Sequence, residues 1–206
     1  PVSETGTPIE VFRGTDSFSG IGNRELNYGA AYYPSLRTTL SYKYDSDNLG
    51  DTLSFFDSDG SSSSDVPTLR TNTRFVASLE KQVAALPVML PASGAIAGIY
   101  AQVDRTRGVF KAPANISLNS VIAPTQKITD EEQQDLNEHH SGKSINVIRS
   151  FAGKGVLVWG ARTLEGNSNE WRYISVRRFF LFVEESLRKA IEPFVFESNN
   201  QNTYDR

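Results

Sequence analysis

Four stretches of the chain are predicted to be helices, and in the first and the last of them apolar residues recur mostly at intervals of three and four positions, the spacing of an amphipathic helix. The stretches are 68–86, a segment from Ser93 to just before Gly108, 129–139, and about 175–191. In the second, we expect the serine to cap the start and the glycine to follow the end. In the third, a threonine with a glutamate three positions later forms a capping box, which predicts a surface helix.

Shorter apolar runs lie between these helices and predict strands. A buried strand that ends at Pro34 is expected in the apolar patch at 28–36. The runs at 145–151 and 156–164 flank a short glycine-containing loop that is typical of a β-hairpin. Strands that alternate with helices indicate an α/β or α+β fold with a central mixed β-sheet flanked by helices.

The segment 43–66 has a different composition. One lysine stands against six aspartates, which gives a net charge of −5, and four consecutive serines lie at 61–64. This Ser/Asp-rich segment predicts a solvated loop. Asp57 and Asp59 resemble part of a calcium loop, but the residues at the first and last ligand positions are apolar. We therefore divide the chain into a peripheral strand and acidic loop region at 1–66 and a core at 67–206.

The segment 171–191 carries the opposite charge, +3 overall, and a wide apolar surface. Its arginines, interleaved with aromatic residues, suit either stacking on single-stranded nucleic acid or pairing with carboxylates of this or another subunit. The chain as a whole is acidic, with a net charge of −3 and a pI near 5.5, and this favours pairing of the arginines with carboxylates over nucleic-acid binding. The apolar surface must be covered at a domain centre or by another subunit. The candidate contact residues are Arg172, Arg177, Arg178, Arg188 and Lys189, with Asp57 and Asp59 from the acidic loop.

The stretch EHHSGKS at 138–144 contains the most suggestive chemistry in the chain. A phosphate-binding loop would need a glycine where Asn137 stands, and two adjacent histidines on a helix point in different directions, which disfavours joint metal binding. The stretch is therefore interpreted as a turn, and Lys143→Ala is expected to be neutral. The chain also has no cysteine and no G-x-S-x-G elbow. We predict no catalytic, metal or cofactor site and no enzymatic activity.

The amino-acid composition indicates a folded globular protein. The chain has 206 residues, of which 38% are hydrophobic and 22% charged, which is typical of a folded globular protein. Its apolar runs are far shorter than the ~20 residues of a membrane helix, and no signal peptide is visible. The missing initial methionine and the polar end directly after the last helical pattern lead us to expect a fragment of a longer protein.

Several sequence blocks resemble one known family. RGVFKAPAN at 107–115, SINVIRSFAGKGVLVWGARTL at 144–164 and WRYISVRRFFLFVEESLRKAIEPFVFESN at 171–199 are similar, in order and spacing, to the tail sheath proteins of contractile phage tails and contractile injection systems. The residues of this resemblance that we single out as the family-motif core are Gly108, Lys111, Pro113, Asn146, Trp159, Gly160 and Arg162. Among them, Trp159 is expected to pack in the core and Arg162 to form a pair there.

The resemblance implies a structural and mechanical protein. Subunits of the family stack as six-membered rings into a helical cylinder around an inner tube, and contraction drives the tube through a target envelope. The implied partners are further copies of the chain, the inner tube protein, and baseplate and tail terminator proteins, without nucleic acid or membrane insertion. The implied location is a virion tail or the bacterial cytoplasm. The family's terminal arms are expected to be missing here. A nucleic-acid-binding or hydrolytic α/β domain is the alternative.

Overall fold

The computed structural model describes residues 8–14, 20–42, 55–56, 62–63, 73–198 and 201. Contacts divide the chain into two units. The larger unit comprises residues 1–35, 91–119 and 124–206, and the smaller unit comprises 36–90 and 120–123. The boundary predicted between residues 66 and 67 lies outside the described residues.

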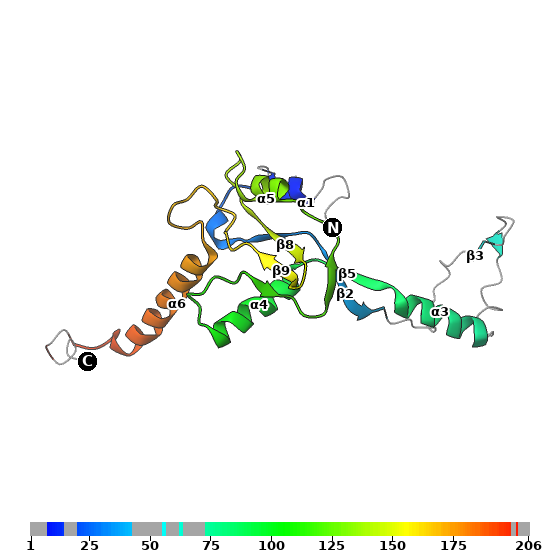
Figure 1. The fold of residues 1–206 in the computed structure, drawn as a ribbon. Helices are drawn as coiled ribbons and strands as arrows, with labels where there is room; N and C mark the ends of the chain where they lie inside the picture. The colour runs from blue at the N-terminus through cyan, green and yellow to red at the C-terminus, as the bar shows by residue number, and fades with distance from the viewer. Residues whose placement is uncertain are drawn as a thin grey trace. The chain divides into compact units, whose positions relative to one another are not determined.

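A four-stranded sheet forms the centre of the larger unit (Figure 1). Its order is β1 (Ala31–Tyr33), β8 (Ile145–Phe151), β9 (Gly155–Trp159) and β6 (Ile116–Ser117). The first two strands are parallel, whereas the other two pairings are antiparallel. The predicted mixed sheet is therefore confirmed.

The predicted hairpin is formed by β8 and β9, but β9 is shorter than expected. It ends at Trp159, because Gly160 packs directly on Asn146: a Cβ at Gly160 would lie 2.7 Å from Oδ1 of Asn146. Beyond that point the Asn146 side chain, and not a neighbouring strand, accepts the backbone N–H of Arg162 at 2.7 Å. The tail of the predicted strand, 160–164, thus leaves the sheet.

Helices cover both faces of this sheet. On one face, α1 (Pro8–Arg13) and α5 (Asp130–Asn137) contribute to a hydrophobic cluster with β1 and β8. The buried members of the cluster are Ala31, Tyr33, Ile128, Leu136, Ile145, Val147 and Leu164. Since side chains alternate along a strand, Tyr32 points to the other face, where its hydroxyl lies 2.9 Å from that of Tyr100 on α4 (Ser93–Thr106).

The ends of the helices are only partly as predicted. At α5, both hydrogen bonds of the Thr129–Glu132 capping box are present. At α4, the N-cap is Ala92, which makes no side-chain cap, so the predicted serine cap is wrong. Gly108 follows this helix with φ of +96°, and its N–H donates to the carbonyl of Val103 at 3.1 Å. This left-handed conformation is why glycine terminates the helix.

The strand predicted in the apolar patch at 28–36 starts later than expected and stops before Pro34, in agreement with the predicted end. A 3-10 turn, η1 (Leu26–Tyr28), leads into β1, and a cis Tyr33–Pro34 peptide bond separates β1 from the next strand, β2 (Leu36–Ser41). β1 and β2 therefore belong to different sheets.

The smaller unit contains a three-stranded sheet that the sequence did not predict. Its order is β5 (Pro87–Leu90), β2 and β7 (Val121–Pro124). The helix α3 (Thr73–Ala85) precedes β5, in agreement with the predicted stop before Pro87. A short pair, β3 (Phe55–Phe56) and β4 (Ser62–Ser63), lies within the predicted loop at 43–66. Asp57 and Asp59 lie outside the described residues.

Candidate functional site

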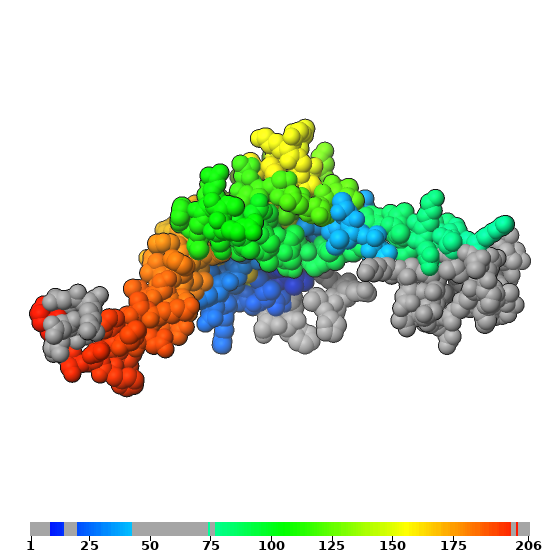
Figure 2. Space-filling view, turned by 90° about the horizontal axis from the view of Figure 1, so that it is seen from below, coloured from blue at the N-terminus to red at the C-terminus, as the bar shows by residue number. Residues whose placement is uncertain are grey.

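The helix α6 (Ile174–Ile191) presents an uncovered apolar surface. Its first residue, Ile174, is buried, but further along the helix large apolar side chains are exposed by 40 to 57%. These are Phe179, Phe180, Leu181, Phe182, Leu187 and Ile191, and Phe196 beyond the following turn η3 (Glu192–Phe194) is 98% exposed. Figure 2 shows α6 in orange, uncovered on the face drawn. Within the part of the chain that the structure describes, no other element covers these side chains, and exposed apolar patches of this kind mark interaction surfaces.

Arg177 is not an exposed contact residue, contrary to the prediction. Its side chain is buried, and its guanidinium carbon lies 3.8 Å from the ring centre of Tyr28 and 4.8 Å from that of Trp171. These cation–π contacts anchor the start of α6 to the rest of the larger unit.

Arg178 pairs within the chain. Its two terminal nitrogens donate to the carboxylate of Asp104 on α4, at 2.9 and 2.5 Å, and the guanidinium carbon lies 4.6 Å from the ring centre of Tyr100. Burial is the main cause of a raised pKa for the Tyr100 and Tyr32 hydroxyls. A charge reversal at both Arg177 and Arg178 would therefore disrupt the fold itself and would not report on partner contacts.

The basic residues near the end of α6 remain on the surface. Arg188 and Lys189 contact the carboxylate of Glu185 at 2.7 and 3.2 Å. The hydrogen bonds from both side chains lower the pKa of Glu185 to about 2. Exposed pairs of this kind contribute little to stability and exchange partners at small cost.

Asn146 is the most constrained of the family-motif residues. Its side chain is 1% exposed. The amide nitrogen donates to the carbonyls of Ala31 at 3.1 Å and Arg162 at 2.7 Å, and the amide oxygen accepts from the N–H of Arg162. One side chain thus ties β1 and β8 to the segment that follows β9.

Arg162 reaches the end of α5. It donates to the carbonyl of Asn137 at 3.3 Å and pairs with the Glu138 carboxylate at 3.1 Å. The remaining motif residues differ in environment, since Pro113 is buried and Lys111 is exposed.

Trp159 does not pack in the core, contrary to the prediction. Its side chain is 38% exposed, although its ring centre lies 4.7 Å from that of Phe151 on the neighbouring strand. The preceding residues Val156, Leu157 and Val158 are all buried because the middle of β9 is covered on both faces. Trp159 lies at the end of the strand, where that cover stops.

The EHHSGKS stretch forms a turn, as interpreted, but Lys143 is not an exposed turn residue. Its side chain is fully buried and its Nζ donates to the carbonyl of Gly14. Burial lowers the pKa of this amine. Because Lys143→Ala would remove a buried side chain and this donor, a neutral effect is no longer expected.

The described residues contain no group of three or more histidine, cysteine, aspartate or glutamate side chains placed to hold a metal ion.

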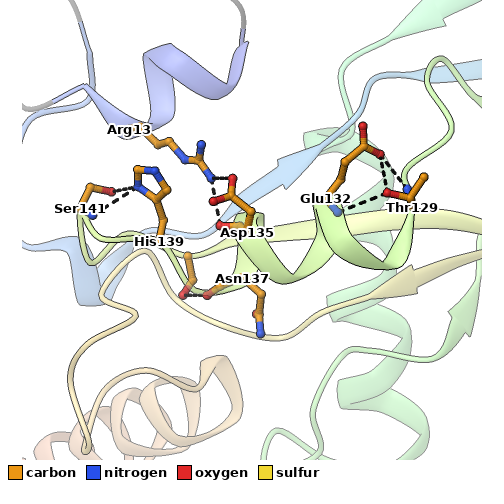
Figure 3. Close-up of polar contacts among 8 residues, drawn as sticks. Arg13, Thr129, Glu132, Asp135, Asn137, His139 and Ser141 are labelled. Atoms are coloured by element: carbon orange, nitrogen blue, oxygen red, sulfur yellow. Dashed lines mark hydrogen bonds and ion pairs between the residues drawn. The ribbon is translucent and has the colours of Figure 1, made fainter.

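His139 is fixed in one tautomer by the turn (Figure 3). The backbone N–H of Ser141 donates to its Nδ1 at 3.2 Å, so in the neutral ring the proton resides on Nε2. Partial burial, followed by the charges of Arg13 and His140, lowers the pKa of this ring below 6.5. Arg13 itself pairs with Asp135 at 2.6 Å, which joins α1 to α5.

This environment predicts a stability change in weakly acidic solution. Because the folded pKa of His139 lies below the unfolded value of 6.5, the unfolded chain binds the proton more strongly. The contribution of neutral His139 to the free energy of unfolding is complete above pH 6.5, and it is lost as the pH falls through the folded pKa. The melting temperature should therefore fall as the pH is lowered below about 6.5, and less so in His139→Gln. An identical slope in the variant, measured by calorimetry, would contradict this assignment.

Two cavities lie beside these residues in the larger unit. A polar cavity of about 410 Å³ is lined by Arg162, Arg172, both histidines and the asparagines at 137 and 167. A second cavity of about 430 Å³ includes Trp159 and Tyr173 in its wall. The sequence did not predict either cavity, because the walls come from segments that are far apart along the chain, such as those of Ala112 and Tyr173 in the second cavity. The only sequence signal was the cluster of glycine, histidine and asparagine around 137–144.

The described residues contain no helix that is both long and apolar enough to cross a membrane.

Comparisons with known proteins identify relatives of one kind. The sequence profile of the phage tail sheath protein central domain matches residues 24–164. A tail sheath protein of Vibrio phage KVP40 is 26% identical over 118 residues, which cover 55% of this chain and 17% of the phage protein.

Two solved structures are similar in sequence and fold. One is the baseplate of the anti-feeding prophage, with 48% identity and a TM-score of 0.53, and the match covers 58% of this chain and 32% of that chain. The other is the sheath complex of an extracellular contractile injection system, PVC, in its contracted state, with 45% identity, a TM-score of 0.54, and coverage of 58% and 33%. The chain thus spans about a third of the length of these structural relatives.

The profile match includes β1, β8 and β9, together with the motif residues Asn146 and Arg162 and the contacts that they make. It covers more than half of the chain and agrees with both structural comparisons. The chain belongs to the phage tail sheath protein family.

Proposed function

We propose that this chain is part of a structural subunit of a contractile sheath. The subunit polymerises as a helical stack of six-membered rings around an inner tube, and the stack shortens to drive the tube through a target envelope. The assembled particle is a phage tail or a related injection system, where the subunit has a mechanical and not an enzymatic role.

The observation that carries this proposal is the exposed apolar surface of α6 in a member of the sheath family. Six large side chains exposed by 40 to 57% on one helix are costly for a chain that acts alone. Their burial against neighbouring copies supplies a free energy for polymerisation, at roughly 25 cal/mol for each Å² of apolar area removed from water.

The start of α6 suits a subunit that moves as a rigid body. The buried Arg177 and the pair between Arg178 and Asp104 hold the helix on the larger unit, so a force on the exposed half is transmitted to the sheet. Contraction then requires interfaces that repack between two discrete arrangements, and a rigid subunit favours this over gradual deformation.

The partners proposed beyond the chain itself are the inner tube and baseplate proteins. Arg188 and Lys189 remain the candidate contact residues for an acidic partner, because they are 73 and 68% exposed and their pairing with Glu185 is replaceable. The anti-feeding prophage relative belongs to a six-fold symmetrised baseplate, which supports a ring of six.

Electron microscopy tests this function directly. The full-length protein, co-expressed with its tube protein, is expected to form hollow filaments with cogwheel-shaped cross-sections in negative stain. Omission of the tube protein is the control and should reduce the number of extended filaments. A protein that stays monomeric at all concentrations, with and without the tube protein, would refute the proposal.

A further inference from the structure

The polar cavity of the larger unit holds an arginine that lacks an anionic partner. Arg172 makes no ion pair with a carboxylate among the described residues; its Nη2 donates to the neutral side chain of Asn169. Its Nε is buried and has no hydrogen-bond partner there. Arg162, which also lines this cavity, forms an ion pair with Glu138. The cavity thus carries an excess positive charge, which an oxyanion would neutralise.

The walls of the cavity are held in place before any ligand arrives. The backbone N–H of Gly166 donates to the carbonyl of Gly142 at 2.9 Å, and Ser144 Oγ donates to the carbonyl of Asn137 at 2.7 Å. A Cβ at Gly166 would lie 2.2 Å from Ser144 Oγ, so the two turns approach as closely as glycine permits. A site formed in advance loses little entropy when it binds.

The second cavity adjoins the first, because Asn137 and Arg162 line both. Its wall contains two exposed aromatic side chains, Trp159 at 38% and Tyr173 at 45%. Aromatic side chains of this kind, next to a cationic pocket, are typical of surfaces that bind a protein segment. Inorganic phosphate is much smaller than the first cavity and would gain nothing from the second, so the pair of cavities favours a peptide.

We propose that the two cavities form one docking site for a peptide segment of a partner protein, in which an acidic residue lies next to an apolar residue. The acidic side chain binds at Arg172 in the polar cavity, and the apolar side chain packs against Trp159 and Tyr173. This inference goes beyond the sheath role and does not depend on contraction.

Titration calorimetry on the unassembled full-length protein tests the proposal. The probes are a capped hexapeptide of alternating glutamate and leucine, its glutamine and leucine counterpart, and inorganic phosphate. The glutamate peptide is expected to bind at least tenfold more tightly than the other two. Arg172→Gln should weaken its binding at least tenfold, and Trp159→Ala should weaken binding of both peptides.

Arg107→Gln is the matched control, since this arginine is exposed after α4 and lines neither cavity. It should bind the glutamate peptide as the unaltered protein does. Equal affinity for the glutamate and glutamine peptides would overturn the proposal even if Arg172→Gln failed to fold. Binding of phosphate as tight as that of the glutamate peptide would also overturn it. None of these outcomes bears on filament formation, which is measured separately.

Discussion

Replacement of Asn146 by alanine is expected to lower the free energy of unfolding by about 3 kcal/mol, since it removes three hydrogen bonds of a buried side chain. The carbonyls of Ala31 and Arg162 and the N–H of Arg162 lose their hydrogen-bond partner, and water does not replace it easily because Asn146 is only 1% exposed. No other side chain replaces the amide, because Gly160 packs directly against it. Chemical denaturation of the purified chain measures this loss, and the melting temperature should fall by roughly 6 to 12 °C.

Ser150→Ala provides the control for Asn146→Ala. Ser150 lies on the same strand but is exposed, so its replacement should change the free energy of unfolding by no more than about 0.5 kcal/mol. If Asn146→Ala were as stable as this control, the amide would not be the link between β1, β8 and the segment after β9.

The second large effect is expected for assembly. A triple variant with Phe179, Phe182 and Leu187 replaced by glutamine should fold but not form filaments. The three side chains are exposed by 43 to 55%, so their replacement costs the unassembled chain little. If assembly buries them, the loss is about 4 kcal/mol or more for each interface, which raises the critical concentration about a thousandfold. Glutamine keeps a high helix propensity, so α6 itself should persist.

Sedimentation and negative-stain microscopy compare this triple variant with Leu86→Gln. Leu86 is equally exposed, at 56%, but belongs to the smaller unit and not to α6. The control should sediment as filaments and the triple variant as single subunits with an unchanged melting temperature. Filaments of normal length from the triple variant would show that α6 is not a subunit interface.

Much of the larger unit follows from local sequence patterns. The capping box at Thr129, the glycine after α4 and the hairpin at 145–159 were predictable because each depends on residues within a few positions of one another. The family itself was recognisable from the blocks around KAPAN and VWGAR. These features are decided by backbone conformation and by the period of apolar residues.

Side-chain environments were predicted less well. Arg177 was predicted to pair with a carboxylate as a candidate contact residue, yet it is buried between the rings of Tyr28 and Trp171. Lys143 in a polar turn indicated exposure, yet it reaches a carbonyl far away in the sequence. In each case a partner from a distant segment compensates for the buried charge. The spacing of apolar residues along the chain carries no information about such a partner.

The sequence by itself therefore determined the four helices α3 to α6, the hairpin and the family, because short-range hydrogen bonds and amphipathic spacing depend on neighbouring residues. It did not predict the short helix α1. Only the tertiary structure decided that Trp159 faces outward, that α6 leaves its apolar surface uncovered, and that Arg162 and Arg172 line one cavity. These outcomes depend on which distant segments meet after folding, and the free energy of those contacts is a property of the packed chain and not of any local stretch.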